Sequence, residues 1–405
     1  MAVESNTLHI GGVSTEALAK KYGTPLYVYD AAIIRERYRN LADHIPYPYL
    51  QIHYAVKANS NPAILKLLRQ EGAGAEVVSK GLALLAMQAG YKPSQVIYTC
   101  NGATTEELQF MADNNILVNI DSVAQLNKWG ELKPGSRVSL RLNLDIGAGH
   151  HIYTTTGGRQ SKFGIHQSEI KTAKQTAKRH GLTIIGLQQH IGSGIASIAA
   201  FNKAISALLR VAYQFPDLEL LDFGGGFSVP YKPGEEALNM AKLGSTLTAA
   251  MGRFAREYGR DLKVIIEPGR YLVAEAGTLL ARVTDIKSNP SRTFVSIDTG
   301  FNHLIRPAMY FAYHRVSNAS RLRGQRRKAT VVGNVCESAD IFAKDYPLSK
   351  PQEDDLIAVH DAGAYGYAMS SLYNGRPRPA EVLIDDGKVR LIRKRQEVEN
   401  LLEEF

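Results

Sequence analysis

Four groups of residues that lie far apart in the sequence have side chains suited to one kind of chemistry. Lys57 ends the strand-like run IHYAVK, His190 opens HIGSG, Gly224–Gly226 lie in DFGGGF, and Glu267 opens EPGR. A desolvated lysine amine forms a Schiff base with an aldehyde, and an imidazole can stack on a flat ring. Glycines let backbone N–H groups close around a phosphate. A carboxylate can keep a ring nitrogen protonated, and a protonated ring accepts an electron pair. The set therefore indicates pyridoxal 5'-phosphate chemistry.

Each of these residues also has an ordinary structural explanation. A lysine at a strand end is usually solvated, and a histidine in an apolar strand is more often a core residue. Three glycines can simply form a tight turn, and a glutamate before Pro-Gly can cap a loop. The functional interpretation therefore depends on a fold that brings all four groups to one place.

The order of apolar runs along the chain predicts such a fold. Eight β-rich runs alternate with amphipathic segments such as NPAILKLLRQEG and SEIKTAKQTAKRHG. The runs are IHYAVK (52–57), AEVVS (75–79), VIYTC (96–100), LVNID (117–121), SLRLN (139–143), IIGLQQHIG (184–192), LLDFGGG (220–226) and KVIIEPG (263–269). Eight such units predict an α/β fold, a (β/α)8 TIM-type barrel. A doubly wound open sheet is the alternative. The barrel is preferred because the unusual residues all end strands, and those ends share one rim.

The pattern changes after residue 270. Turns, with little helix between them, separate the strand-like segments GTLLARVTDIKS, RTFVSIDTG, KATVVGNVCES, DLIAVHDAGAY and AEVLIDDGKVRLIRK. These segments predict a C-terminal all-β barrel or sandwich, and the strand-like NTLHIGGVS near the start can pair into it. We therefore expect a cofactor-binding barrel over residues 25–270 and a β-rich domain formed by residues 1–24 and 271–405.

The composition limits other classes of function. Hydrophobic residues make up 44% and charged residues 21% of the 405 positions, which is typical of globular proteins. The net charge is +9, but the densest basic cluster, SRLRGQRRK (320–328), lacks interleaved aromatics and is interpreted as a solvated loop, with no nucleic-acid partner. No apolar run predicts a membrane span, and the first residues are not typical of a signal peptide. Two distant cysteines, Cys100 and Cys336, favour a reducing cytoplasm.

Longer motifs give the chain a family resemblance. They are YAVKAN, SKFGI (161–165), HIGSG, DFGGGF, EPGRYLVAEAG, IDTGFNHLIRPAMYFAYH (297–314), VVGNVCESADIFAKD (331–345) and GAYGYAMSSLYNGRPRPAEVL (363–383). With these motifs the chain resembles the fold-type III pyridoxal-phosphate decarboxylases, and within them the diaminopimelate decarboxylases. The resemblance extends from about residue 20 to near residue 395.

The resemblance implies roles for particular residues. It implies that Lys57 carries the cofactor and that Cys336 is the general acid that protonates the carbanion. The implied cofactor-binding residues are Lys57, His190, Ser193, Gly224, Gly225, Gly226, Glu267, Gly269, Arg270 and Tyr365. The implied substrate-binding residues are Arg270, Arg306, Tyr310, Glu337 and Tyr365. Guanidinium and phenol groups suit a distal carboxylate, and a glutamate suits a distal ammonium.

The resemblance also implies an activity and an assembly. The activity is decarboxylation of meso-2,6-diaminopimelate to L-lysine, in lysine biosynthesis. Cys336 and Glu337 come from the partner subunit in this family, so a homodimer with active sites shared across the interface is expected. Three alternatives stay open: the same chemistry on another amino acid or a carboxylated intermediate, a non-catalytic homologue that binds a partner enzyme, and a racemase. Intact Lys57, Cys336 and Glu267 argue against the last two.

Three positions depart from the family pattern, and one loop is unusual. Gly194 stands where glutamine is common, Leu82 where glutamate is usual, and His303 where an acidic residue is common. The segment 145–165 is rich in glycine and threonine and is interpreted as a mobile lid. It contains His150 and His151, but adjacent histidines point apart and no other ligand spacing completes a set, so no metal site is expected.

Overall fold

The chain forms two compact units. The computed structural model describes residues 3–4, 6–149 and 156–403. The first unit, here called the barrel unit, contains Arg37–Val229 and Glu236–Tyr271. The second, called the β unit, contains Met1–Glu36, Pro230–Glu235 and Leu272–Phe405. A short segment from within the barrel sequence, Pro230–Glu235, therefore belongs to the β unit.

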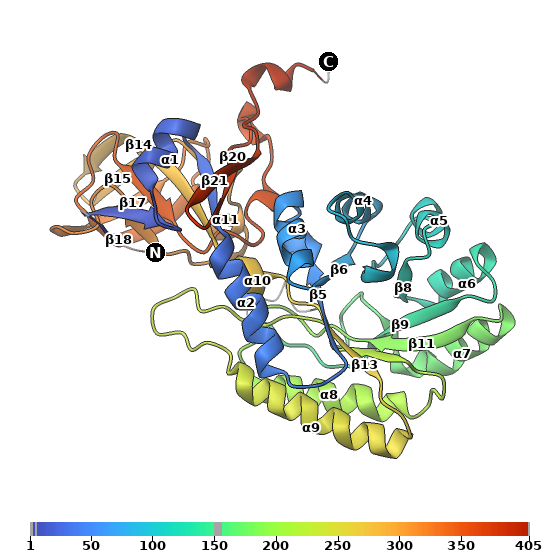
Figure 1. The fold of residues 1–405 in the computed structure, drawn as a ribbon. Helices are drawn as coiled ribbons and strands as arrows, with labels where there is room; N and C mark the ends of the chain where they lie inside the picture. The colour runs from blue at the N-terminus through green and yellow to red at the C-terminus, as the bar shows by residue number, and fades with distance from the viewer. Residues whose placement is uncertain (1–2, 5, 150–155, 404–405) are drawn as a thin grey trace. The chain divides into compact units, whose positions relative to one another are not determined.

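Eight parallel strands close into a ring in the barrel unit (Figure 1). They are β5 (Leu50–Ala55), β6 (Gly74–Val77), β7 (Val96–Thr99), β8 (Leu117–Ile120), β9 (Arg137–Asn143), β11 (Thr183–Gln188), β12 (Leu220–Asp222) and β13 (Lys263–Ile266). Each strand pairs with the next, and β13 pairs back onto β5. A two-residue strand, β10 (Ile165–His166), adds to β9. Because the ring is closed, the predicted TIM-type barrel is confirmed and the alternative of an open sheet is wrong.

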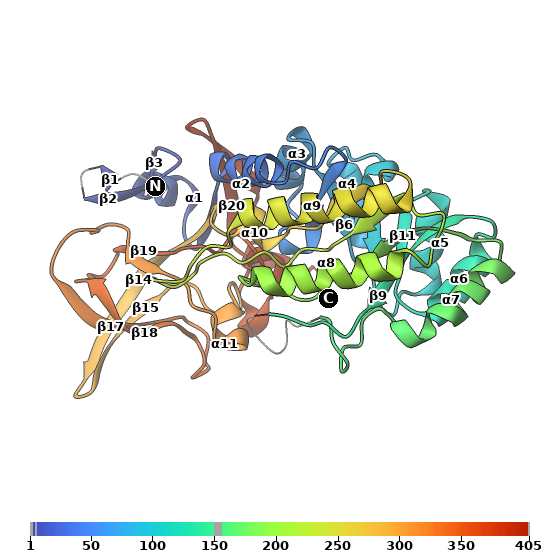
Figure 2. The same cartoon turned by 90° about the horizontal axis from the view of Figure 1, so that it is seen from below.

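Helices lie outside these strands (Figure 1). They are α2 (Ala31–His44), α3 (Pro62–Gln70), α4 (Lys80–Gln88), α5 (Thr105–Asp113), α6 (Val123–Leu132), α7 (Ile170–Arg179), α8 (Ile198–Ala212), α9 (Met240–Tyr258) and the short α10 (Arg270–Val273). Figure 2 shows α8 and α9 side by side. Local sequence begins several of them: Asn61 Oδ1 accepts the N–H of Ala63 at 3.0 Å, and Thr104 and Glu107 form a reciprocal capping box.

The interior of the barrel changes from apolar to polar along the strands. Its apolar part is a cluster of Ile97, Ile185, Leu220 and Ile265. Toward the C-terminal ends of the strands, Asp222 is fully buried, and Glu76 and Gln188 are each 1% exposed. Strands of a parallel sheet that are buried on both faces are usually continuous apolar runs. The buried polar side chains therefore distinguish the C-terminal rim, where barrel active sites lie.

The β unit is built around a mixed, mainly antiparallel sheet in the order β18-β17-β15-β14-β4-β20-β21, with β16 and β19 alongside. The strands are β4 (Leu26–Asp30), β14 (Gly277–Asn289), β15 (Arg292–Ile297), β16 (Val316–Asn318), β17 (Arg326–Val332), β18 (Ile341–Ser349), β19 (Leu356–Val359), β20 (Ala380–Asp385) and β21 (Lys388–Arg393). The unit also contains α1 (Thr15–Tyr22), α11 (Arg306–Tyr310) and a small sheet of β1 (Val3–Glu4), β2 (Thr7–Ile10) and β3 (Val13–Ser14).

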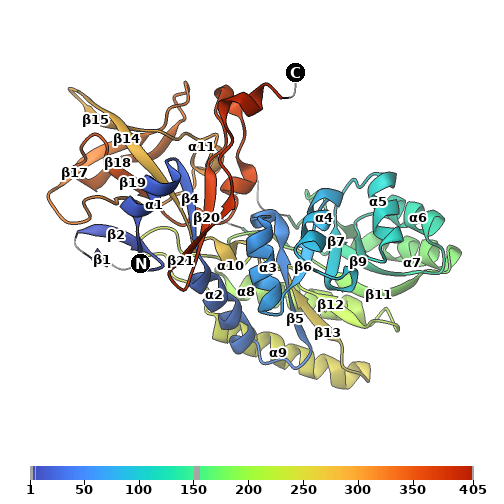
Figure 3. The same cartoon turned by 45° about the horizontal axis from the view of Figure 1, so that its top comes forward.

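Strand β4 corrects the expected start of the barrel at residue 25. Figure 3 shows β4 between β14 and β20, where it pairs antiparallel with β14 and parallel with β20. All five residues of β4 are buried, which is typical of a central strand. The apolar pattern LYVYD predicts a buried strand, but it does not say which of two sheets the strand joins, because that depends on partners more than 240 residues away.

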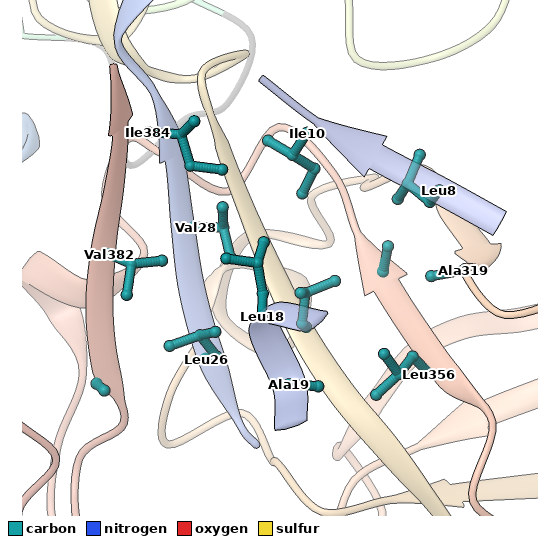
Figure 4. Close-up of a cluster of buried hydrophobic side chains, with 13 residues drawn as sticks. Leu8, Ile10, Leu18, Ala19, Leu26, Val28, Ala319, Leu356, Val382 and Ile384 are labelled. Atoms are coloured by element: carbon teal, nitrogen blue, oxygen red, sulfur yellow. The ribbon is translucent and has the colours of Figure 1, made fainter. Parts of the chain in front are cut away.

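One apolar cluster connects the small N-terminal sheet, α1 and the large sheet of the β unit (Figure 4). It consists of Leu8, Ile10, Leu18, Ala19, Leu26, Val28, Leu280, Ala319, Leu356, Ala358, Ala380, Val382 and Ile384. Burial of this surface fixes the N-terminal segment to strands from the end of the chain. Within the described residues, no helix has the length and apolar character needed to cross a bilayer.

Candidate active site

Lys57 lies at the C-terminal rim of the barrel, in a single 3-10 turn, Val56–Ala58, that follows β5. Its Nζ is 2.6 Å from Oε2 of Glu76 on the neighbouring strand β6. The Lys57 side chain is 37% exposed, whereas that of Glu76 is 1% exposed. A buried carboxylate therefore holds the Lys57 amine in place, while part of the side chain stays accessible to a ligand. Lys57 is thus not an unattached lysine at a solvated strand end.

His190 and the glycine run form one packed structure. Gly225 donates its N–H to Nδ1 of His190 at 3.3 Å, so the proton of the neutral ring is on Nε2. Burial and the positive charges of Arg141 and Lys57 lower the pKa of His190 to about 3. The ring is therefore neutral at physiological pH, and the hydrogen bond from the glycine loop fixes its orientation.

All three glycines in the loop are required by close approach of other backbone, since a Cβ on Gly224 would lie 2.5 Å from the carbonyl oxygen of Gln189. A Cβ on Gly225 would lie 2.1 Å from the carbonyl oxygen of Glu267, and one on Gly226 would lie 2.3 Å from that of Gly192. Gly226 also holds φ +97, which L residues rarely adopt. Among the described residues, the N–H groups of Gly224 and Gly225 are bonded to Asp222 and His190, whereas the N–H of Gly226 has no partner.

Glu267 follows β13 and is buried against three polar groups from other strands. Gln188 donates its amide N–H to Oε2 of Glu267 at 3.1 Å, while Oε1 has no N–H donor in the described part of the chain. Burial and the nearby charge of Glu76 raise the pKa of Glu267 to about 7, with Lys57 acting in the opposite direction. The fully buried Asp222 at the end of the neighbouring strand β12 is the other carboxyl group beside it. The carboxyl group thus has an unsatisfied acceptor atom inside the rim.

Ser193, Gly269 and Arg270 lie in the two adjoining rim loops. Arg270 opens α10 and donates from Nη2 to Oγ of Ser193 at 3.2 Å. A Cβ on Gly269 would lie 3.1 Å from the Cβ atoms of Ala55 and Ala58, so glycine lets this loop pack against the Lys57 turn. All the barrel residues expected from the sequence are therefore in the rim loops or at strand ends.

These residues fit a pyridoxal 5'-phosphate group. Lys57 supplies an accessible amine, Oε1 of Glu267 is a buried acceptor without a donor in the described chain, and the glycine loop offers the N–H of Gly226. Within the described residues, no group of three or more His, Cys, Asp or Glu side chains is arranged to hold a metal ion.

Three residues of this site were missed by the sequence interpretation: Glu76, Gln188 and Asp222. Each interrupts an apolar strand (AEVV, IIGLQ and LLD). Such an interruption is unusual in strands buried on both faces, and it is the signal that could have identified them. They contact Lys57 or Glu267 directly and determine the electrostatics of both.

In the β unit, Arg306 is 2% exposed and lies within a set of rings. Its guanidinium carbon is 4.6 Å from the ring centroid of Tyr231. Its Nη1 donates to Nε2 of His314 at 2.9 Å, and Nδ1 of His314 donates to the carbonyl of His360 at 2.8 Å. This chain of contacts fixes the orientation of the guanidinium, as a bidentate anion site requires.

The other expected substrate residues of the β unit are less enclosed. Tyr310 ends α11, and Tyr365 lies in a loop with φ +56, an unusual value for a tyrosine. Cys336 and Glu337 are exposed. The thiol of Cys336 donates to Oδ1 of Asn374 at 3.2 Å, and the Tyr373 hydroxyl donates to Glu337. The thiol and the carboxylate of this loop are therefore accessible to another molecule.

Both ring nitrogens of His303 are hydrogen-bonded to groups of its own unit. Nδ1 accepts from the Thr299 hydroxyl at 2.9 Å, and Nε2 donates to the Pro377 carbonyl at 3.1 Å. Burial lowers its pKa to about 4. Both ring nitrogens are therefore occupied within the β unit, and the departure from an acidic residue here does not by itself argue for another substrate.

A His303→Gln variant tests this interpretation through pH. The folded chain resists protonating His303 until about pH 4, while the unfolded chain binds a proton near pH 6.5, so this stability is present above pH 6.5 and is lost as the pH falls toward 4. The wild type should lose about 3 kcal/mol more than the variant over that range. Urea unfolding at several pH values measures the difference. Parallel pH profiles combined with a raised KM would contradict a structural role.

The other two departures have local explanations. Leu82 is the third residue of α4, whose N-cap Ser79 accepts its N–H at 3.2 Å; a glutamate at that position would complete a capping box that leucine cannot form. Gly194 holds φ +72, a conformation that glycine adopts without strain.

Part of the expected lid, residues 145–165, lies outside the described residues, as do His150 and His151. The described ends of the segment are attached to the rim. Asn143 donates its side-chain N–H to the Gly158 carbonyl at 3.0 Å, and Thr156 donates its hydroxyl to the His190 carbonyl at 3.2 Å. On one side of the undescribed residues Ala148 donates its N–H to the Ile191 carbonyl, and on the other side Thr156 bonds His190; the role of the loop as a lid stays a prediction.

Comparison with known proteins gives the family. Residues 31–274 match the family model described as pyridoxal-dependent decarboxylase, pyridoxal binding domain. The chain belongs to this family of pyridoxal-dependent decarboxylases. It is 43% identical to the diaminopimelate decarboxylase of Methanothermobacter thermautotrophicus, over 98% of this chain and 94% of that protein. It is 39% identical to that of Escherichia coli, over 95% and 94%.

A solved structure agrees with these relatives. The diaminopimelate decarboxylase of M. jannaschii in co-complex with L-lysine superposes with a TM-score of 0.93 at 31% sequence identity. The match covers 100% of this chain and 96% of that one. The agreement extends over both units, so the fold class expected from the sequence is confirmed for the β-rich part as well as for the barrel.

Proposed function

We propose that this chain removes carbon dioxide from meso-2,6-diaminopimelate to give L-lysine. The observation that carries the proposal is the 43% identity to a diaminopimelate decarboxylase over 98% of the chain, together with a barrel rim that offers Lys57 and Glu267. The lysine complex of the M. jannaschii enzyme supports the identity of the product. The two cysteines are both free thiols, in keeping with a reducing cytoplasm as the proposed location.

The cofactor is pyridoxal 5'-phosphate, which supplies an electron sink for the bond that breaks. Lys57 would hold it through the amine, which Glu76 orients at 2.6 Å. Glu267 would accept the ring N–H, and His190 would stack on the ring. The phosphate would be bound by the backbone N–H groups of Gly226 and Ser193, with Gly224, Gly225 and Gly269 shaping the loop, and by Arg270 and Tyr365.

The substrate is bound by cations and hydroxyl groups that match its two carboxylates. Arg306, oriented by His314 and Tyr231, binds the distal carboxylate together with Tyr310. Glu337 takes the distal ammonium, and Arg270 and Tyr365 complete the contacts. The Cys336 thiol donates its proton to the carbon that has lost carbon dioxide, which ends the reaction with a hydrogen in place of the carboxyl group.

The test of this function is product identification. Purified protein with pyridoxal 5'-phosphate is incubated separately with meso-diaminopimelate, L-ornithine, L-arginine and L-lysine, and released carbon dioxide and amine products are measured. L-Lysine formed only from diaminopimelate is the expected result. Inertness toward diaminopimelate with turnover of another amino acid would identify the alternative substrate, and inertness toward all four would favour the non-catalytic homologue.

We further propose a homodimer in which each active site takes Cys336 and Glu337 from the partner. Support comes from their exposure and from exposed apolar groups in the same unit: Tyr373, which is bonded to Glu337, is 44% exposed, Met309 47% and Phe311 86%. Phe311 also holds φ +51. A large aromatic side chain held outward on an unfavourable backbone is typical of an interface anchor.

Complementation tests the sharing of residues. Lys57→Ala and Cys336→Ala subunits are each expected to be inactive alone. When they are co-expressed with different tags, a mixed dimer contains one site with both substitutions and one with neither. Random assortment should therefore restore about a quarter of wild-type activity. Activity that stays at the background of the single variants in purified mixed dimers would show that each subunit uses its own Cys336.

A Phe311→Asp variant tests the interface itself. A charge in place of a buried anchor should weaken self-association by roughly 100-fold, because it is desolvated without a partner. Sedimentation equilibrium measures the dissociation constant. Tyr49→Asp, at a tyrosine that is 48% exposed in the barrel unit, is the matched control and should leave it unchanged. An unaltered dimer in Phe311→Asp would remove Phe311 from the interface.

A further inference from the structure

Two buried carboxyl groups meet below the rim of the barrel. Asp222 ends β12, and Glu267 follows β13, the strand paired with β12 through Asp222 and Ile265. Residues two apart on a strand face the same way, so Glu267 extends from the side on which Ile265 and Asp222 face each other. Asp222 is fully buried and Glu267 is 6% exposed, and one oxygen of each, Oδ2 of Asp222 and Oε1 of Glu267, has no donor among the described residues. Two neighbouring buried carboxyl groups can satisfy each other only when one of them carries a proton and donates it.

No other group in the described residues donates a hydrogen bond to the two oxygens that face this proton. Asp222 Oδ1 accepts the N–H of Gly224 at 2.9 Å, and Glu267 Oε2 accepts from Gln188 at 3.1 Å. The remaining oxygens, Oδ2 of Asp222 and Oε1 of Glu267, have no N–H or other O–H donor within the described chain. Two ionised carboxylates this close in a buried site would repel each other strongly.

The surrounding charges decide which group keeps the proton. Glu267 faces Lys57, whose positive charge lowers its pKa, as well as Glu76, whose negative charge raises it. For Asp222 the charged neighbours, Glu267 and Glu76, are both negative. Burial and the charge of Glu267 raise the pKa of Asp222 well above its ordinary value. The more deeply buried group without a neighbouring cation is the one that stays neutral.

We propose that Asp222 is a positioning residue that is held as a neutral acid and donates its O–H to Glu267. The donated hydrogen bond fixes the Glu267 carboxylate as an anion, oriented toward the ring nitrogen of the cofactor. This inference rests on the proposed function for the identity of the ring. The hydrogen bond itself is a property of the cofactor-free chain and can be tested there. Asp222 acts only through Glu267.

The geometry offers a conservative variant. In Asp222→Asn the amide oxygen can keep the Gly224 N–H, and the amide nitrogen takes the place of Oδ2 and donates permanently to Glu267. The variant reproduces the neutral acid without a titrating proton. Asp222→Leu keeps the branched shape but supplies no donor, so it leaves Glu267 without the hydrogen bond. Asp355→Asn is the matched control, because Asp355 is also buried, at 5% exposed, but is paired with Arg321 at 3.0 Å in the β unit.

Two measurements test the proposal. Infrared spectra of the cofactor-free protein at about pH 8.5, above the pKa of about 7 of Glu267, should contain the carbonyl band of a buried protonated carboxyl group, which Asp222→Asn loses and Asp355→Asn keeps. Equilibrium titration with pyridoxal 5'-phosphate should give Asp222→Asn an affinity within about threefold of wild type and Asp222→Leu one roughly tenfold weaker, the loss of one hydrogen bond to a charged group.

Particular outcomes would overturn it. Persistence of the acid band in Asp222→Asn would show that the proton belongs to another group. Equal cofactor affinity in Asp222→Leu and wild type would show that Glu267 does not need the donor. Equal weakening in Asp222→Asn and Asp222→Leu would show that shape or charge matters and the proton does not. None of these depends on which amino acid is decarboxylated, so failure here is distinct from failure of the proposed substrate.

Discussion

A Lys57→Ala variant is expected to lose the visible absorbance of bound cofactor and to decarboxylate diaminopimelate roughly 10⁴-fold more slowly. The amine is the only group at the rim proposed to hold the cofactor covalently. Removal of Nζ also leaves Glu76, whose side chain is 1% exposed, without the cation 2.6 Å away. An unpaired buried charge is costly, so the variant is also expected to be less stable than wild type. Absorbance after gel filtration and carbon dioxide release measure the two effects.

The control for this variant is Lys80→Ala. Lys80 lies in the same unit at the start of α4 and makes an ion pair of the same length, 2.6 Å, with Glu106, whose side chain is 79% exposed. Exposed pairs contribute little, so rate and absorbance should stay within about twofold of wild type. A Lys57→Ala protein that retains colour and rate would overturn both the proposed chemistry and the site.

A Glu267→Gln variant should lower kcat by roughly 10²- to 10³-fold with a much smaller effect on the KM for diaminopimelate. A neutral amide stabilises a ring N–H less than a carboxylate does, so the cofactor becomes a weaker electron sink. The distal substrate contacts come from other residues, which is why binding is largely spared. Steady-state kinetics over a range of substrate concentrations separate the two parameters.

The same variant should not be less stable than wild type without cofactor. Burial and Glu76 raise the pKa of Glu267 to about 7, so this group favours the folded chain in its protonated form. That contribution is complete below about pH 4.5 and is lost as the pH rises through 7. A glutamine has no proton to lose. Thermal unfolding of the cofactor-free proteins at pH 8 should therefore give Glu267→Gln an equal or higher midpoint. A lower midpoint together with a reduced kcat would indicate a folding defect instead.

This opposition between activity and stability has a plain physical origin. Glu76, Asp222 and Glu267 are three buried acids close together, with Lys57 as the positive charge that opposes them at Glu267. Burying several like charges costs stability, and such arrangements persist where a ligand or a reaction requires them. A cofactor whose ring carries an N–H would provide the Glu267 carboxylate with one more hydrogen-bond donor than Gln188 and Asp222 supply.

The sequence by itself was enough to determine the barrel and the main candidates of its rim. Strand runs alternating with amphipathic helices at even spacing predict a parallel ring, because each strand needs a crossover helix to reach the next. Lys57, His190, the glycine run and Glu267 could be selected because each ends a strand, and strand ends meet at one rim. Those are local properties, and a single sequence carries them.

Other features were decided only by tertiary contacts. Whether LYVYD joins the barrel or the β unit depends on β14 and β20, distant strands that offer it hydrogen bonds. His303 is structural because Thr299 and the Pro377 carbonyl occupy its ring nitrogens. The proton shared by Asp222 and Glu267 exists because two strands bring their carboxyl groups together out of water. Local sequence determines which residues form a strand, whereas partners, burial and protonation depend on what the folded chain places beside them.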